Sequence, residues 1–227
     1  MKISSEFSKY ALEYNSYNII QSKVVSKLLT LSDSKPKRIL DLGCGNGALC
    51  NAIDWEYTYF TALDFASGML KLHPKSEKIE CINGNFNESS LFENLAKNKY
   101  EHVFSASALQ WAENLERVFQ NIKRLNSSIS LAIFTSGTFE TLYKTAKLAP
   151  LLSSTSLIKE LSDKYFKADF EIVKYTLEFE STREMFRYIK KSGVSGSRNV
   201  LTFMQTKKLM KEYPLNYLEF EVAFISC

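Results

Sequence analysis

Residues 38–47 read Arg-Ile-Leu-Asp-Leu-Gly-Cys-Gly-Asn-Gly, and this stretch decides the fold because a short apolar run meets a turn of alternating glycines. The run at residues 39–42 has no polar face and follows Pro36, so it predicts a buried parallel strand. Three of the chain's eight glycines then fall within five residues. Glycine lets bare backbone approach a ligand that any Cβ would push away, so we interpret the turn as a nucleotide-binding loop.

Similar apolar runs recur along the chain. Strand-like runs follow the first one at residues 57–63, 79–82, 103–106, 129–134, 170–179 and 217–225. Helix-compatible stretches separate the earlier runs, at residues 67–72, 91–96 and 115–125. This alternation is typical of βαβ units, so we predict an α/β, Rossmann-like fold with a doubly wound, mostly parallel seven-stranded sheet. Right-handed crossovers would place the loops after the strands along one edge, where a ligand binds.

The flanking segments predict one domain with appended parts. Residues 19–31 carry apolar side chains at the spacing of an amphipathic helix, which we assign to an N-terminal helical arm over residues 1–34. A cofactor-binding core at 35–135 precedes helical stretches near 139–148 and 157–161, which we interpret as an inserted cap at 136–168. Residues 169–227, with further helices near 183–191 and 206–211, would complete the sheet and the substrate site.

Composition narrows the class of protein. The 227 residues have a net charge of +4, which does not by itself imply a nucleic acid partner. No apolar stretch approaches the roughly 20 residues that span a bilayer, and the first residues lack a signal core. Four cysteines without a C-x-x-C pair, together with two histidines, argue against a metal site. We therefore expect a soluble, cytoplasmic, metal-free monomer without a membrane partner.

The pattern D-x-G-x-G-x-G formed by Asp41 and the three glycines resembles motif I of class I methyltransferases that use S-adenosylmethionine. Gly43, Gly45 and Ala48 also satisfy the G-x-G-x-x-A form of a dinucleotide-binding fingerprint, so spacing alone does not choose the ligand. Asp41 favours S-adenosylmethionine, because a carboxylate there would attract the methionine ammonium and repel a pyrophosphate. Asp64 ends the next strand and would accept hydrogen bonds from both ribose hydroxyls of either ligand.

The resemblance to class I methyltransferases implies a set of cofactor-binding residues. Phe65 and Met69 would flank the adenine, although both also suit the core. Asn85 stands where the family usually has an Asp that accepts from the adenine amino group, and its amide oxygen can still accept that bond. The complete expected cofactor set is Asp41, Gly43, Cys44, Gly45, Gly47, Asp64, Phe65, Met69, Asn85, Phe86, Ser105, Gln110 and Trp111.

Residues 104–111, Phe-Ser-Ala-Ser-Ala-Leu-Gln-Trp, resemble the S-x-x-A-[LV]-Q-W segment of malonyl-carrier-protein O-methyltransferases, the biotin-pathway enzymes called BioC. Four further stretches resemble that family in order, so the similarity spans nearly the whole chain. They are Phe7 with Tyr14, where Tyr10 and Ala11 stand at the family's two alanine positions; residues 134–142, somewhat shortened; residues 189–194 with Arg198; and residues 213–217, with Asn216 for Thr.

The BioC resemblance implies methyl transfer to the free carboxylate of a malonyl thioester on acyl carrier protein, or on coenzyme A. That carboxylate is already a nucleophile near neutral pH, so the reaction needs positioning and partial desolvation rather than a general base. Arg198 offers a fork matched to a carboxylate, and Tyr14 or Tyr217 could donate a phenolic hydrogen bond. These three residues form the expected catalytic set, with Lys190 and Lys191 as the next candidates for the carboxylate.

The sequence is also compatible with other functions. Another small-molecule carboxyl methyltransferase is the nearest alternative. A nicotinamide oxidoreductase lacks a Tyr-x-x-x-Lys pair here, and a non-catalytic binding protein would not need so complete a loop. Between residues 183 and 211, eight basic side chains face a single acid, which predicts either a docking face for an acidic carrier protein or a solvated helical surface. His73 and His102 are expected to be structural, with His73 at a helix end on the surface.

Overall fold

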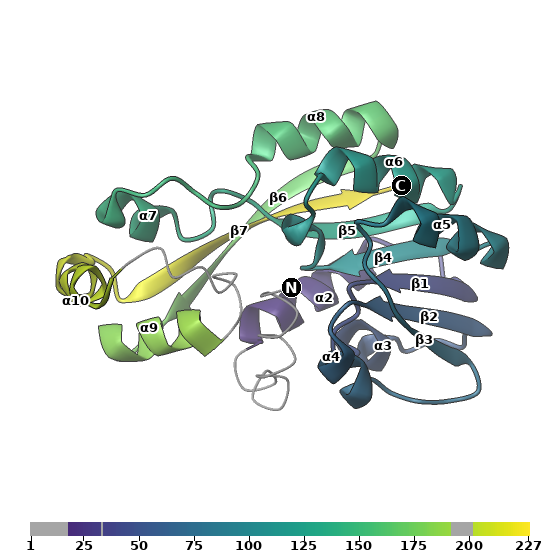
Figure 1. The fold of residues 1–227 in the computed structure, drawn as a ribbon, viewed down its shortest axis with the longest axis horizontal. Helices are drawn as coiled ribbons and strands as arrows, with labels where there is room; N and C mark the ends of the chain where they lie inside the picture. The colour runs from purple at the N-terminus through teal and green to yellow at the C-terminus, as the bar shows by residue number, and fades with distance from the viewer. Residues whose placement is uncertain (1–17, 33, 192–201) are drawn as a thin grey trace.

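The computed structural model describes residues 18–32, 34–191 and 202–227 (Figure 1). They form one seven-stranded sheet with the strand order β3-β2-β1-β4-β5-β7-β6. The strands are β1 (Arg38–Leu42), β2 (Tyr59–Asp64), β3 (Ile79–Asn83), β4 (His102–Ala106), β5 (Ser128–Phe134), β6 (Asp169–Glu178) and β7 (Tyr217–Ser226). The first five pair in parallel, and β7 is antiparallel to both β5 and β6. The predicted doubly wound, mostly parallel α/β sheet is therefore confirmed.

Helices cover both faces of this sheet (Figure 1). They are α2 (Ile19–Thr30), α3 (Ala48–Ala52), α4 (Ser67–Leu72), α5 (Ser89–Leu95), α6 (Leu115–Arg124), α7 (Glu140–Ala146), α8 (Thr155–Tyr165), α9 (Thr182–Lys191) and α10 (Phe203–Glu212). The short α3, directly after the glycine loop, is not among the helices predicted from sequence. Within the described residues, no helix combines the length and the apolar character needed to cross a membrane.

The parallel strands alternate their side chains between two apolar cores. Ile39 and Phe104 belong to the core that also contains residues of α2 and α9. Their neighbours Leu40 and Val103 belong to the opposite core, with residues of α5, α6 and α8. Because successive side chains of a strand point to opposite faces, strands covered on both sides become apolar throughout. This explains why the strand at residues 39–42 could be recognised as an uninterrupted apolar run.

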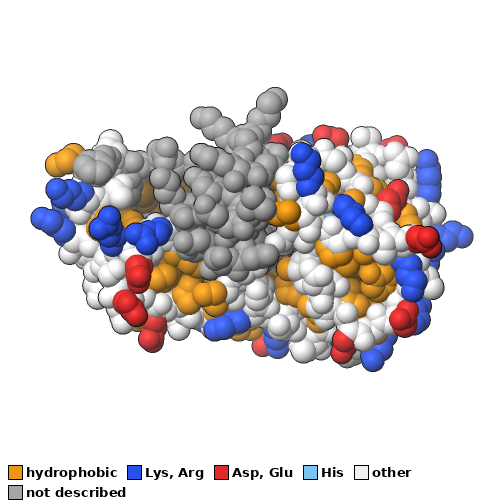
Figure 2. All heavy atoms as spheres, turned by 90° about the horizontal axis from the view of Figure 1, so that it is seen from below, with side chains coloured by type: hydrophobic (Ala, Val, Ile, Leu, Met, Phe, Trp, Pro, Cys, Tyr) orange, Lys and Arg blue, Asp and Glu red, His pale blue; other side chains and the backbone are white. Residues whose placement is uncertain are grey.

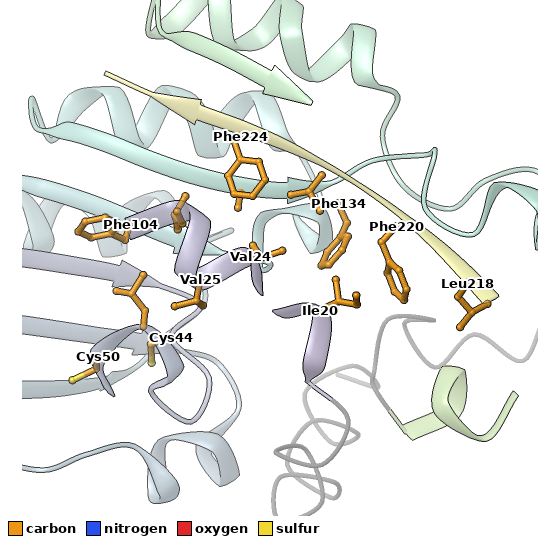
Figure 3. Close-up of a cluster of buried hydrophobic side chains, with 14 of the residues drawn as sticks. Ile20, Val24, Val25, Cys44, Cys50, Phe104, Phe134, Leu218, Phe220 and Phe224 are labelled. Atoms are coloured by element: carbon orange, nitrogen blue, oxygen red, sulfur yellow. The ribbon is translucent and has the colours of Figure 1, made fainter. Parts of the chain in front are cut away.

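Packing, rather than capping, holds α2 on the sheet. No side chain caps its amino end, yet Ile20, Val24 and Leu28 are fully buried. Figure 3 shows Ile20 and Val24 directed at phenylalanines of β5 and β7, including Phe134 and Phe224. Burial of each such side chain contributes about 1.5–3 kcal/mol. The helix is therefore a fixed wall beside the carboxyl ends of the central strands.

The antiparallel pair of β6 and β7, here named the β6–β7 pair, extends past the rest of the sheet. Only the second half of β7, residues 222–226, pairs with β5, whereas the whole strand pairs with β6. Figure 1 shows α7, α9 and α10 grouped around the extension. Glu221 in β7 accepts hydrogen bonds from the hydroxyls of Thr135 (2.5 Å) and Thr155 (2.8 Å). Glu219 accepts hydrogen bonds from the backbone N–H and the hydroxyl of Thr141, so two carboxylates of β7 attach the segment after β5 to the β6–β7 pair.

Candidate active site

A pocket opens at the carboxyl ends of β1, β2 and β4, beside the first turns of α2. It encloses about 760 Å³, including the part that is open to solvent. Its lining residues come from α2, the glycine loop and α3, the end of β2 and α4, and the segments after β3 and β4. They are Asn18, Gln21, Val25, Asp41, Gly43, Cys44, Gly45, Asn46, Ala48, Leu49, Asp64, Phe65, Met69, Phe86, Ala106, Ser107, Ala108 and Trp111.

Asp64 ties the glycine loop to the end of β2. One carboxylate oxygen accepts from the Gly45 backbone N–H at 2.9 Å, and the other accepts from the Ala66 backbone N–H at 2.7 Å. The backbone N–H of Gly43 donates to the Leu63 carbonyl at 2.8 Å, which fixes the start of the loop. Burial raises the Asp64 pKa, while its backbone hydrogen bonds act in the opposite direction. Each oxygen has a second lone pair, so the carboxylate can still accept from two ligand hydroxyls.

Asp41 is a buried carboxylate without a hydrogen-bond partner among the described residues. It is 1% exposed, and neither carboxylate oxygen has a protein donor. Burial, and secondarily the charge of Asp64, raise its pKa from 3.8 to about 8. An unpaired buried carboxylate is unfavourable unless a cation or a donor meets it. Because Asp41 lines the pocket, a ligand ammonium is the chemical group that would satisfy it.

The three glycines of the loop are needed for different reasons. A Cβ on Gly43 would lie 2.2 Å from the Cβ of Ala108, and one on Gly47 would lie 2.4 Å from Pro74. A Cβ on Gly45 would meet no atom within 4 Å. All three have left-handed backbone, with φ of +77°, +55° and +90° in chain order. Close approach of a ligand therefore explains only Gly45, whereas contacts within the protein require glycine at the other two positions.

Apolar side chains form most of the remaining wall. Phe65, Met69, Phe86 and Trp111 line the pocket as expected from sequence. Cys44 lines it too, and burial raises the pKa of its thiol, so this side chain is a neutral part of the wall. Flat and flexible apolar groups suit the face of a purine ring.

Four residues of the expected cofactor set do not line the pocket. Gly47 lies against Pro74, as described above. The Ser105 hydroxyl donates to the Leu42 carbonyl at 2.7 Å and so joins β4 to β1. The Gln110 amide donates to the Ser107 carbonyl at 2.6 Å. The Asn85 oxygen accepts from the backbone and side chain of Asn87, at 3.0 and 2.9 Å, so local hydrogen bonds occupy it.

The expected catalytic residues are only partly described. Tyr14 and Arg198 lie outside the described residues, and so do the side chains of Lys190 and Lys191. Tyr217 is half-buried at the start of β7, in the part of the β6–β7 pair that extends past β5. Its carbonyl accepts from the Tyr213 hydroxyl at 2.9 Å, and its side chain does not line the pocket described above.

Polar pocket residues that sequence reasoning missed come from α2 and from the loop after β4. The Oε1 atom of Gln21 and the Oγ atom of Ser107 are buried without a partner among the described residues. Ser107 also has φ of +62°, a strained conformation of the kind that clusters at ligand sites. A polar Gln21 on the buried stripe of an amphipathic helix was the available sequence signal.

The two histidines are structural in this arrangement. The Nε2 atom of His102 lies 2.9 Å from the Ser130 hydroxyl, and burial lowers the His102 pKa to about 4. The expectation that His73 is a surface residue is wrong, because it is 2% exposed and packs where Gly47 has no Cβ. Neither lines the pocket. Among the described residues, no group of three or more His, Cys, Asp or Glu side chains could hold a metal ion.

Residues 40–133 match the family model described as "Methyltransferase domain". The chain carries a methyltransferase domain. It is 22% identical to a malonyl-[acyl-carrier protein] O-methyltransferase of Bacillus cereus, over 92% of this chain and 86% of the relative. A protein of the same name from Acetivibrio thermocellus is 29% identical, over 93% and 85%. A putative methyltransferase structure from Anabaena variabilis shares the fold at 13% identity, with a TM-score of 0.62 over 90% of this chain and 97% of that one.

These matches confirm the predicted class I methyltransferase fold and an S-adenosylmethionine-dependent methyltransferase, rather than the nicotinamide oxidoreductase. The pocket of the methyltransferase domain fits this cofactor on its own chemistry. Asp41 supplies an unpaired carboxylate where an ammonium is needed, and Asp64 has lone pairs left for a diol. Phe65 and Met69 supply apolar surface for the base.

Proposed function

We propose that this chain transfers a methyl group from S-adenosylmethionine to the free carboxylate of a malonyl thioester carried by acyl carrier protein, in biotin precursor synthesis. The observation that carries the proposal is the extent of the likeness to its relatives. Malonyl-[acyl-carrier protein] O-methyltransferases match over more than nine tenths of the chain, well beyond residues 40–133 of the generic domain. The likeness therefore reaches the segments that follow β5.

The described residues would act by binding and orienting. Bound in the pocket, S-adenosylmethionine would supply a sulfonium methyl group that an ionised oxygen can accept directly. Asp41 would hold the ammonium and Asp64 the ribose hydroxyls, while Phe65 and Met69 enclose the adenine. The apolar wall would exclude water from the reacting oxygen, which strengthens a carboxylate as a nucleophile.

The proposed chemistry needs no proton acceptor. A carboxylic acid with an ordinary pKa near 4 is ionised at neutral pH, so its oxygen attacks without a general base. No histidine is among the lining residues within the described part of the chain, which agrees with a reaction driven by positioning. Arg198, Tyr14 and Tyr217 are our proposed clamp for the carboxylate, on the resemblance of their segments to the family.

Label transfer tests this function directly. Methyl-labelled S-adenosylmethionine is incubated with the protein and malonyl carrier protein, malonyl-coenzyme A, free malonate or acetyl carrier protein. We expect base-labile label on malonyl carrier protein and none on acetyl carrier protein, which lacks the free carboxylate.

Other outcomes would redirect the proposal. Label on acetyl carrier protein would place the methyl group on the protein itself. Transfer to small acids but not to a malonyl thioester would favour another small-molecule carboxyl methyltransferase. Arg198→Ala should lower kcat/KM at least tenfold and leave cofactor affinity unchanged, because it removes the proposed cationic partner of the substrate carboxylate. Gel filtration of the same sample tests the expected monomer.

A further inference from the structure

One face of α10 is basic and largely uncompensated. Met204, Lys207, Lys208 and Lys211 follow the i, i+3, i+4, i+7 spacing of a single helix face, and all four are exposed. Leu209 lies on the other side and is buried, so the orientation of the helix is fixed by packing. A capping box between Thr202 and Gln205 defines its first turn. The basic stripe is therefore displayed on an ordered helix.

Helix α9 adds to the same charged region. Arg183 and Arg187 lie one turn apart and are exposed, while Met185 and Tyr188 are buried against the β6–β7 pair. Residues of α9 and α10 are in contact with each other. Figure 2 shows Lys and Arg side chains close together at the left end of the molecule, where Figure 1 places these two helices.

Few cations of this region have an acidic partner. Within the described residues, Lys208 pairs with Glu212 at 3.7 Å, and no acidic side chain pairs with Arg183, Arg187, Lys207 or Lys211. Elsewhere, exposed lysines such as Lys144 and Lys159 lie 2.6 and 2.5 Å from acidic neighbours one helical turn away. Residues 183–211 hold eight basic side chains and one acidic side chain, whereas a solvated helical surface normally mixes both signs, so this imbalance indicates a partner of opposite charge.

The position of the region relative to the pocket suits a substrate carrier. The pocket opens at the carboxyl ends of the parallel strands, and β6 and β7 extend past that same edge. Figure 1 shows α9 and α10 around this extension. A macromolecule seated on the two helices would therefore stand on the side from which a tethered group enters.

We propose that Arg183, Arg187, Met204, Lys207, Lys208 and Lys211, here named the basic platform, dock the acidic surface of the carrier protein whose thioester is methylated. This inference rests on the proposed function. Met204 is 70% exposed and offers a flexible apolar contact at the edge of the charges, as protein interfaces often use. It is the only exposed large apolar side chain described on the platform, which is too little for insertion into a bilayer.

The test separates docking from chemistry with two substrates. The double variant Lys207→Glu/Lys208→Glu is compared with Lys97→Glu/Lys123→Glu, an equal charge change at exposed lysines of the α5 to α6 region. We expect the platform variant to lose at least tenfold in kcat/KM for malonyl carrier protein and less than twofold for malonyl-pantetheine, which has no carrier. The control should change neither value more than twofold. Added salt should lower carrier turnover of the wild type more steeply than that of the platform variant.

Direct binding makes the result independent of turnover. Anisotropy of labelled carrier protein should show at least tenfold weaker binding to the platform variant, and Met204→Ser should weaken it several-fold. Equal losses for both substrates, or unchanged carrier binding, would overturn the platform. Binding to phosphatidylglycerol vesicles or duplex DNA in place of carrier protein would also overturn it. A wild type that binds the carrier through the platform but methylates neither thioester would instead refute the proposed function.

Discussion

At the scale of single residues, Asp41 has the most unusual environment in the pocket. Its carboxylate is buried, lacks a protein donor among the described residues, and has a pKa raised to about 8 by burial. The folded state therefore binds this proton more tightly than the unfolded state, where the pKa is near 3.8. Ionisation of Asp41 thus reduces the stability of the cofactor-free protein progressively as pH rises from about 4 to about 8.

Asp41→Asn removes this pH-dependent cost. We expect the cofactor-free variant to gain thermal stability relative to wild type, with an advantage that grows between pH 5 and pH 8. Cofactor affinity should fall by about 1.5–3 kcal/mol, because the ammonium loses a charged acceptor. Differential scanning fluorimetry and calorimetry measure the two effects. A stability difference that is constant with pH would contradict the assignment of the raised pKa.

Gly43 and Gly45 offer a matched pair within one loop. Both have left-handed backbone, so alanine costs about 1–2 kcal/mol at either site. At Gly43 the new Cβ also collides with Ala108, which adds about 1–3 kcal/mol of overpacking. We expect Gly45→Ala to weaken cofactor binding more than stability, and Gly43→Ala to lower the free energy of unfolding in urea more strongly. Equal unfolding free energies would show that the loop relaxes around Ala108.

At the scale of elements, α2 owes its place to one buried stripe. Ile20 is fully buried and Ile19 is 45% exposed, so two adjacent isoleucines allow the buried and the exposed side of the helix to be compared. Ile20→Ala should cost about 2–5 kcal/mol of unfolding free energy, as buried large-to-small changes do. Ile19→Ala should cost about 1 kcal/mol or less. Chemical denaturation compares them, and similar losses would mean that helix propensity rather than packing controls α2.

The β6–β7 pair lies outside the cofactor-binding core at residues 35–135 and attaches the segment after β5. Half of β7 pairs with β6 alone, and Glu219 and Glu221 fasten the segment after β5 to it through threonine hydroxyls. Burial raises the pKa of Glu221, but its hydrogen bonds and Lys174 outweigh burial, so the pKa is lowered overall. The carboxylate form therefore stabilises the attachment at neutral pH and loses this effect as pH falls through the lowered pKa.

At the scale of the whole molecule, the methyltransferase domain and the flanking segments share one pair of cores. The core on one sheet face combines α2, β1, β4, β5, β7 and α9. We expect a fragment of residues 35–135 to fail to fold, because β5 loses its partner β7 and the sheet loses α2. Circular dichroism melting of the fragment beside the full chain tests this. A cooperative transition in the fragment would show that the core at 35–135 is an independent domain.

Local pattern determined much of this protein. Apolar runs ending in Asp41 and Asp64 and a glycine turn after the first run established the strands, the parallel sheet and the cofactor edge, because these features depend on neighbours in sequence. The tertiary structure decided which residues of those patterns come into contact with one another. Only packing across the fold places Ala108 over Gly43, brings the Gly45 N–H to Asp64, and directs Gln21 into the pocket. Such contacts join residues far apart in sequence, so they follow from strand order and register, which no local pattern encodes.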